Sequence, residues 1–329
     1  MRAFDLCAGA GGLSLGLQRA GFDVLGLELD ADAIDTHRRH VGPCEKADLR
    51  IYHPTEQRDL TAGGVPCQPF SDAGKGLALD DPRYLVPDFL RIAREAGSRA
   101  VLLENVRGLV KKPRAFRAVL DLFEAEWLTT WTVLDAADFG VPQHRDRVFV
   151  VGFKDAAARA RFRWPNPSHA APGSLFGAPY RTVREALSLG DAPGFAIGTR
   201  NNADLLDLPA PCVTATEQKS AMRGTQPMGR RRRASERLSE ALGALDQPAP
   251  TIKTRVDEGR DAARPSRRPL GELNHAVRLS VEQCALLQGF PPGWTWTGNK
   301  GSQHRQVGNA VPPALAEAMG RAMREALLG

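Results

Sequence analysis

Short apolar runs alternate with amphipathic stretches over the first 153 residues of the chain. The runs have the length and residue types of strands, and the stretches between them repeat apolar residues with the period of a helix. Alternation of this kind predicts an α/β fold with a parallel, doubly wound sheet. We expect strands at Ala3–Cys7, Val24–Glu28, Asp59–Ala62, Ala100–Leu103, Thr130–Leu134 and Arg147–Phe153, and helices at Leu13–Ala20 and Pro113–Trp127.

The pattern changes after Phe153, where proline and glycine become frequent, as in WPNPSHAAPGSLFGAP. Few long amphipathic stretches follow before Leu279, which predicts a second, smaller and loop-rich domain. Regular structure returns with LSVEQCALLQGF and ends in an alanine-rich helix from Pro313 to Leu328. We therefore expect a first domain of residues 1–153 completed by residues 306–329, a second domain of residues 154–278, and a connecting segment of residues 279–305.

The net charge of +6 is concentrated in the second predicted domain. Residues Phe153–Arg278 contain 21 Lys and Arg against 13 Asp and Glu, which leaves 23 against 25 for the rest of the chain. An internal basic segment in an otherwise neutral chain is typical of a module that binds a polyanion. An arginine-rich solvated surface would give the same count, so charge alone leaves both interpretations open.

Nothing in the pattern indicates export, a membrane span or a metal site. No apolar run approaches the roughly 20 residues that a span requires, and the start MRAFDLCAGAGG lacks the features of a signal peptide. The five cysteines have neither disulfide-scaffold nor zinc-site spacing. We expect a cytoplasmic protein without a metal. These cysteines are Cys7, Cys44, Cys67, Cys212 and Cys284.

The first chemical motif, DLCAGAGGLSLGLQRAG, is a glycine-rich turn between a strand and a helix. Its glycines would let a ligand approach the backbone N–H groups at the helix start. The next strand ends at Glu28, about 20 residues on, where a carboxylate can bind the ribose of an adenosine-containing cofactor. Asp48 ends the third crossing and could reach the adenine. The glycine-rich turn, Glu28 and Asp48 follow three successive strands. Because all three have suitable residue types, we favour a cofactor site over the alternative of a tight turn with acids that only face solvent.

Three further motifs are predicted to meet at the same edge of the sheet. GGVPCQPFS places Cys67 between two prolines, after a short strand. AVLLENVRGL delivers Glu104 at the end of a fully apolar strand, which makes a nucleophile–acid pair plausible. In QHRDR, Arg145 and Arg147 are two residues apart on a strand, so both guanidinium groups could face one site. Cys44, Cys212 and Cys284 are interpreted as small buried hydrophobes.

In this order, DLCAGAGG, PCQPFS, ENV, QHRDR and QVGNAVPP resemble the motifs of the DNA (cytosine-5) methyltransferase family. The five motifs span Ala3 to Met319 and form a highly specific set. The resemblance implies a Rossmann-like sheet that binds S-adenosylmethionine. It also implies that the basic residues 154–278 form the target-recognition domain for duplex DNA.

The resemblance also implies roles for the catalytic residues. Cys67 would add to C6 of cytosine, Glu104 would hold or protonate N3, and C5 would then take the methyl group. Arg147 would orient the ring with support from Arg145. The cytosine must leave the base stack to be reached, and the loop Gln68–Arg83 would close over it.

The same family resemblance assigns the binding residues. Cys7 stands where the family usually has phenylalanine, so we expect weaker cofactor binding. The expected cofactor site comprises Leu6, Gly9, Gly11, Gly12, Leu13, Glu28, Asp48, Asn309 and Val311. The expected DNA contacts are Gln68 and Ser71 near the nucleophile and the densest basic run, Arg230, Arg231, Arg232 and Arg233.

Other functions remain open at this stage. A dinucleotide-dependent oxidoreductase would share the glycine-rich turn but would not explain Cys67, Glu104 and the basic segment together. A silent DNA-binding regulator on the same scaffold is disfavoured, because such a protein would be free to lose Cys67, Glu104 and the two arginines, and all are present. A tRNA-directed enzyme is disfavoured by the long basic segment, which suits duplex DNA. We expect a monomer that modifies DNA beside a cognate restriction endonuclease, without a stable complex; a solitary regulatory enzyme is the rival interpretation.

Overall fold

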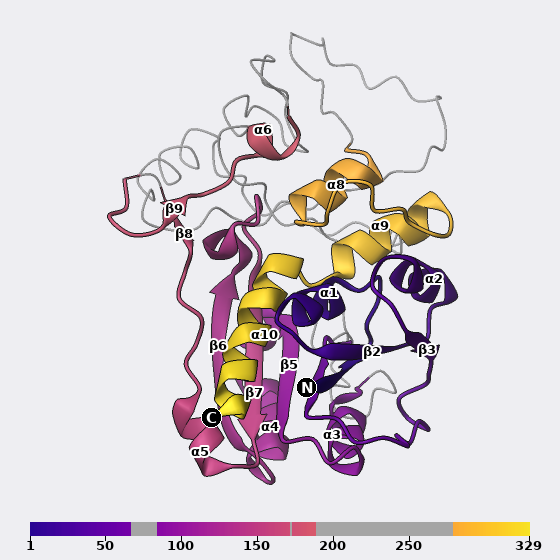
Figure 1. The fold of residues 1–329 in the computed structure, drawn as a ribbon, viewed down its shortest axis with the longest axis vertical. Helices are drawn as coiled ribbons and strands as arrows, with labels where there is room; N and C mark the ends of the chain where they lie inside the picture. Colours follow the sequence, from indigo (N-terminus) through magenta and orange to yellow (C-terminus); the bar gives the residue numbers. More distant parts are fainter. Residues whose placement is uncertain (67–83, 172, 189–278) are drawn as a thin grey trace, which may run out of the picture.

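A computed structural model describes residues 1–66, 84–171, 173–188 and 279–329. Its centre is a sheet of seven strands in the order β3-β2-β1-β4-β5-β7-β6 (Figure 1). The strands are β1 (Arg2–Leu6), β2 (Asp23–Glu28), β3 (Cys44–Lys46), β4 (Leu60–Gly63), β5 (Ala100–Val106), β6 (Leu128–Asp135) and β7 (Asp146–Phe153). The predicted α/β class is therefore confirmed.

Helices cover both faces of this sheet. The helices between and after the strands are α1 (Gly12–Arg19), α2 (Ala31–His40), α3 (Val86–Glu95), α4 (Pro113–Glu124), α5 (Ala156–Arg161) and α10 (Pro313–Leu328). One apolar core lies between the sheet and α1, α5 and α10, and a second lies between the sheet and α3 and α4. Successive side chains of β5 point to opposite faces of the sheet. Leu102 therefore packs in the first core and Leu103 in the second.

The sheet is mixed rather than wholly parallel, which corrects the sequence prediction. The strands β3, β2, β1, β4 and β5 run parallel, whereas β7 is antiparallel to both of its neighbours. The connection 136–145 between β6 and β7 contains only the short 3-10 helix η3 (Ala136–Phe139). A parallel crossover needs a dozen or more residues, so this connection returns the chain in the opposite direction.

The C-terminal part of the chain lies over the start of α1 (Figure 1). Helices α8 (Val281–Leu287) and α9 (Lys300–Asn309) share a third apolar core with Trp294 and Trp296. Thr36 of α2 donates to Gln306 of α9 at 2.7 Å, and His40 stacks on Trp294. These contacts hold α9 and Trp294 against α2.

Only the first part of the second predicted domain is described. It contains the two-residue strands β8 (His169–Ala170) and β9 (Ala178–Pro179) and the short helix α6 (Val183–Ala186). Helix α5, just after the predicted boundary, packs on α10 within the first core. The division into domains stays a prediction, because residues 189–278 lie outside the described ranges. Within those ranges, no helix has both the length and the apolar character needed to cross a membrane.

Candidate active site

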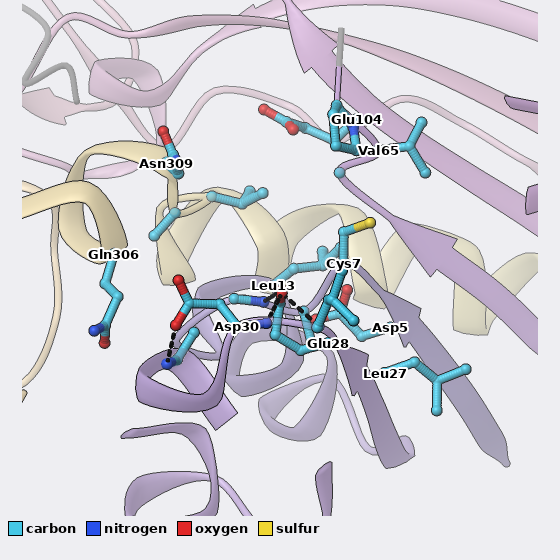
Figure 2. A pocket seen from close by; sticks show the side chains of 18 of the residues that line it. Asp5, Cys7, Leu13, Leu27, Glu28, Asp30, Val65, Glu104, Gln306 and Asn309 are labelled. Atoms are coloured by element: carbon cyan, nitrogen blue, oxygen red, sulfur yellow. Dashed lines mark hydrogen bonds between the residues drawn. The ribbon is translucent and has the colours of Figure 1, made fainter. Parts of the chain in front are cut away.

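A cavity of about 900 Å³ opens at the carboxyl ends of β1, β2, β4 and β5. This is the edge where ligands bind in α/β sheets, and the volume suits a small organic molecule. Figure 2 shows Glu104 and Val65 on one side of the cavity and Glu28 and Asp30 on the other. Asn309 reaches it from the end of α9.

The glycine-rich turn forms the floor on the side of Glu28. Cys7, Gly9 and Gly11 all have positive φ angles, of 59°, 54° and 92°, which bend the chain sharply into α1. A Cβ on Gly12 would lie 2.2 Å from the carbonyl oxygen of Val311, so only glycine allows this contact. The N-cap residue of α1 is Gly11, which has no side chain to cap the helix.

Two acidic side chains line the floor beside this turn. The carboxylate of Glu28 accepts hydrogen bonds from the backbone N–H groups of Gly9 at 2.8 Å and Leu29 at 2.7 Å. Asp48 is paired with Arg50, and the hydrogen bonds from Arg50 lower the pKa of Asp48 to about 2. The carboxylates of Glu28 and Asp48 both line the cavity, with the Arg50 guanidinium beside Asp48.

The opposite wall carries a buried acid–base cluster. Nε of Arg147 lies 2.8 Å from Oε1 of Glu104, and both side chains are about nine-tenths buried. Burial raises the pKa of Glu104 above its ordinary value, although the charges of Arg147 and Arg145 act in the opposite direction. Arg145 and Arg147 both line the cavity, as expected for alternate residues entering one strand.

Residues Gly64, Val65 and Pro66 connect this cluster to Cys67. All three line the cavity, and Asn105 Nδ2 donates to the carbonyl oxygen of Val65 at 3.2 Å. A Cβ on Gly64 would lie 3.0 Å from Oε2 of Glu104. Cys67 itself lies outside the described residues, directly after Pro66. Gln68, Ser71 and Arg230 to Arg233 also lie outside them.

The remaining predicted residues divide into two groups. Gly9, Leu13, Asn309 and Val311 line the cavity together with Glu28, Asp48, Glu104 and the two arginines. Leu6, Gly11 and Gly12 lie just beneath it: Leu6 is part of the second core, and the two glycines form the start of α1. Burial strongly raises the pKa of the Cys7 thiol, so Cys7 stays protonated at neutral pH.

A buried polar network beneath the turn was not predicted from the sequence. Oγ of Ser14 lies 2.6 Å from Oδ2 of Asp5 and 2.9 Å from Nε2 of His37. Nδ1 of His37 faces the carbonyl oxygen of Gly42 at 3.3 Å and must donate to it. Since Ser14 has one hydroxyl proton for two neighbours, the network holds one further proton, on Asp5 or on His37.

Burial assigns that proton to Asp5. It raises the pKa of Asp5 to about 7, with a further rise from the charge of Glu28. Burial lowers the pKa of His37 to about 4, and the charge of Arg38 acts in the same direction. Below that pKa, a protonated Asp5 can donate to Ser14, which then donates to Nε2 of a neutral His37; an ionised Asp5 accepts from the Ser14 hydroxyl.

Replacing His37 with glutamine is expected to reveal the titration of Asp5. The raised pKa of Asp5 makes stability fall as pH rises from about 4 to 7, while the lowered pKa of His37 makes it rise from about 4 to 6.5. These slopes oppose each other in the wild type. In His37→Gln the free energy of unfolding should fall by about 3 kcal/mol more than in the wild type between pH 4.5 and 7.

Urea denaturation at several pH values measures this difference, and groups outside the network cancel in the comparison. His53→Gln is the matched control, because His53 is exposed and pairs only with side chains at the surface. Parallel stability profiles for His37→Gln and the wild type would show that the pKa of His37 is not lowered in the folded protein, which would contradict the assignment of the proton to Asp5.

The arrangement can bind a positively charged adenosine-containing ligand. Oδ1 of Asp5 is buried, lines the cavity and has no hydrogen-bond partner within the described ranges. The space above Gly9 is open, and Glu28 and Asp48 are placed for hydroxyl and amino groups. Among the described residues, no group of His, Cys, Asp and Glu could hold a metal ion.

Comparisons with known sequences give consistent results. The model of the C-5 cytosine-specific DNA methylase family matches residues 1–325. Type II methyltransferase M.NaeI of Lentzea aerocolonigenes is 36% identical, over 99% of this chain and 75% of that protein. Type II methyltransferase M.NgoMIV of Neisseria gonorrhoeae is 33% identical, over 99% of this chain and 97% of that protein.

Two solved structures show the same fold at lower sequence identity. A prophage-encoded E. coli protein described as a DNA modification methyltransferase matches with a TM-score of 0.62 and 22% identity, over the full length of both chains. The Dnmt2 methyltransferase of S. pombe matches with a TM-score of 0.58 and 15% identity, over 97% of each chain. The likeness extends over the whole chain.

Proposed function

Since the chain belongs to the C-5 cytosine-specific DNA methylase family, we propose that it methylates C5 of a cytosine rotated out of duplex DNA into the cavity. The Glu104–Arg147 pair is the observation that carries this proposal. It places a buried acid with a raised pKa on the wall that Gly64 to Pro66 share. Glu104 therefore lies in the cavity that Pro66, the residue before Cys67, also lines.

In the proposed reaction, the Cys67 thiolate forms a bond to C6 of cytosine, and the C5–C6 π electrons move to C5. Arg145 and Arg147 favour the thiolate through their positive charge. C5 then takes the methyl group. Loss of the C5 proton to a base returns an electron pair to the ring and expels the Cys67 thiolate, which restores the double bond.

Glu104 acts at N3 of the ring in this scheme. Protonated Glu104 can donate to N3, so that charge from the addition of Cys67 does not build up on the ring. The burial that raises its pKa favours the protonated form of this acid. Arg147, held against Glu104, would orient the ring, and Arg145 would support this wall.

S-adenosylmethionine supplies an electrophilic methyl group when bound. The family membership implies this methyl donor, and we propose that the acidic floor holds it. Glu28 would bind the ribose, Asp48 the adenine, and Gly9 and Leu13 the methionine end. Asn309 and Val311 would complete the same pocket from the C-terminal part of the chain. Leu6, Gly11 and Gly12 would support this site from beneath. The missing aromatic ring at Cys7 is expected to weaken binding.

The substrate and its setting are proposed in the same way. We infer a duplex DNA substrate read by residues 154–278, with Gln68, Ser71 and Arg230 to Arg233 among the contacts. The similarity to Type II methyltransferases favours a modification enzyme that protects DNA from a cognate restriction endonuclease. We propose a cytoplasmic monomer, with no stable complex between the two enzymes.

Replacing Arg230, Arg231, Arg232 and Arg233 together with glutamine should weaken binding to all duplexes alike. Each phosphate contact that is lost lowers the slope of log affinity against log salt by about 0.9, so four lost contacts would lower it by about 3 to 4. Fluorescence anisotropy across a salt series measures this slope. Arg117→Gln is the control, because Arg117 is paired with Asp121 and Glu124. Unchanged affinity with an altered sequence preference would show base reading instead.

The proposed reaction is tested by incubating the protein with unmethylated DNA and methyl-labelled S-adenosylmethionine. The DNA is then digested to nucleosides for mass spectrometry. Label in 5-methylcytosine is the expected result, and bisulfite sequencing of the same DNA gives the target site. Label on N4 of cytosine, or label on tRNA but not on DNA, would contradict the proposal.

A further inference from the structure

Gln288 connects three segments at the back of the cavity. It follows the last turn of α8, and its side chain is fully buried. Its Nε2 donates to the carbonyl oxygen of Ala310 at 2.6 Å. Its Oε1 accepts from Nε2 of Gln143 at 2.8 Å. One amide therefore joins α8, the segment before β7 and the segment between α9 and α10.

The carbonyl oxygen of Ala310 also accepts a hydrogen bond from Arg145. Nη2 of Arg145 donates to this oxygen at 3.1 Å and to the carbonyl oxygen of Gly308 at 2.7 Å. Arg145 lies close enough to Glu104 to lower its pKa. The two donors at Ala310, from Gln288 and Arg145, thus fix the backbone of the segment relative to the catalytic wall.

The segment held in this way lines the proposed donor site. Gly308, Asn309, Ala310 and Val311 all line the cavity. The carbonyl oxygen of Val311 packs against Gly12 so closely that a Cβ there would overlap it. Gln288 does not line the cavity, so any effect on the reaction must act through the residues that it contacts, such as Ala310 and Gln143.

We propose that Gln288 is a positioning residue: it holds the Ala310 carbonyl so that residues 308–311 form the methyl-donor site and Arg145 stays beside Glu104. This inference rests on the proposed function. The plainer role for a buried glutamine is to anchor α8, which follows the predicted target-recognition domain in the sequence. The two roles predict different effects. A positioning residue would affect binding of the methyl donor, whereas an anchor of α8 would affect binding of DNA.

Two variants separate the contacts of Gln288. Gln288→Met keeps the volume but removes both hydrogen bonds. Gln288→Glu keeps the acceptor for Gln143 and cannot donate to Ala310 when ionised. Gln303→Met is the matched control, since Gln303 is also an amide that donates to backbone carbonyls, at Trp296 and Gly298, but does not touch Ala310.

The dissociation constants of S-adenosylmethionine and S-adenosylhomocysteine are measured by calorimetry without DNA, and KM for each substrate and kcat are measured with DNA. Both Gln288 variants should bind either nucleoside about tenfold more weakly, as expected for one lost buried hydrogen bond. Their kcat should fall several-fold, with KM for DNA within twofold of the wild type. Gln303→Met should match the wild type.

An increase in KM for DNA alone, with unchanged nucleoside binding and kcat, would overturn the inference and show that Gln288 anchors α8. If Gln288→Met unfolds at the assay temperature, Gln288→Glu gives the deciding result. A wild-type protein that binds neither nucleoside would contradict the proposed function itself. Wild-type binding that both variants retain in full would contradict only the role of Gln288.

Discussion

Replacing Cys67 with alanine is expected to lower the rate of methyl transfer by about 10⁴-fold or more, because the variant has no nucleophile to add to C6. Without that addition, C5 of cytosine is too poor a nucleophile to take a methyl group. Binding of DNA and of S-adenosylmethionine should stay within a few-fold of the wild type. Single-turnover assays with labelled donor measure the rate, and filter binding measures DNA affinity.

Cys44→Ala is the matched control for this experiment. Cys44 is buried on β3 and does not line the cavity, and burial raises the pKa of its thiol to about 12. The control should retain activity close to that of the wild type. Methyl transfer by Cys67→Ala at a rate within tenfold of the wild type would exclude the covalent route.

Glu104→Gln is expected to lower kcat by about 10²- to 10³-fold, the usual contribution of a positioned general acid. Glutamine has nearly the same shape but cannot give a proton to N3. It also leaves the buried guanidinium of Arg147 without its ion pair, which should destabilise the fold by about 3 kcal/mol. Thermal unfolding checks the stability, and single-turnover kinetics check the rate.

The pH dependence distinguishes a lost acid from a damaged site. Burial raises the pKa of Glu104, so the wild type loses its protonated acid, and with it activity, as pH rises through that pKa. Glu104→Gln should lack this alkaline decline. Glu126→Gln is the control, because Glu126 pairs with Arg94 and Lys154 at the amino end of β6. A Glu104→Gln rate within threefold of the wild type would show that N3 needs no acid.

The sequence predicted the position of a residue correctly where a single structural rule determines that position. Glu28 ends β2 and Glu104 lies near the carboxyl end of β5. The carboxyl ends of parallel strands share one edge of a sheet, so the presence of both acids in one cavity could be predicted. Pro113 correctly predicted the start of α4 because proline suits the first turn of a helix. The five motifs also gave the correct family, as the family model and the relatives confirm.

Other features were not accessible from the pattern. The pattern of apolar residues in β7 predicts which side chains are buried but not the direction in which the strand runs. Its antiparallel pairing with β5 was therefore not predicted. Helix α2 has few apolar residues and was not predicted as a helix. The contacts of Ser14 with Asp5 and His37, and of Gln143 with Gln288, join residues that are not neighbours in the sequence. Polar residues of this kind are usually exposed, and only the tertiary structure shows that these are buried and paired.

The most direct test of the central claim uses duplex DNA that contains 5-fluorocytosine at the target position. Fluorine at C5 cannot leave as a proton does, so the bond between Cys67 and C6 should persist once the methyl group has been transferred. With S-adenosylmethionine, the account predicts a denaturation-resistant protein–DNA complex whose cross-linked peptide contains Cys67, and no such complex with Cys67→Ala. Methylation of ordinary DNA without any trapped complex, or a cross-link at another residue, would contradict it.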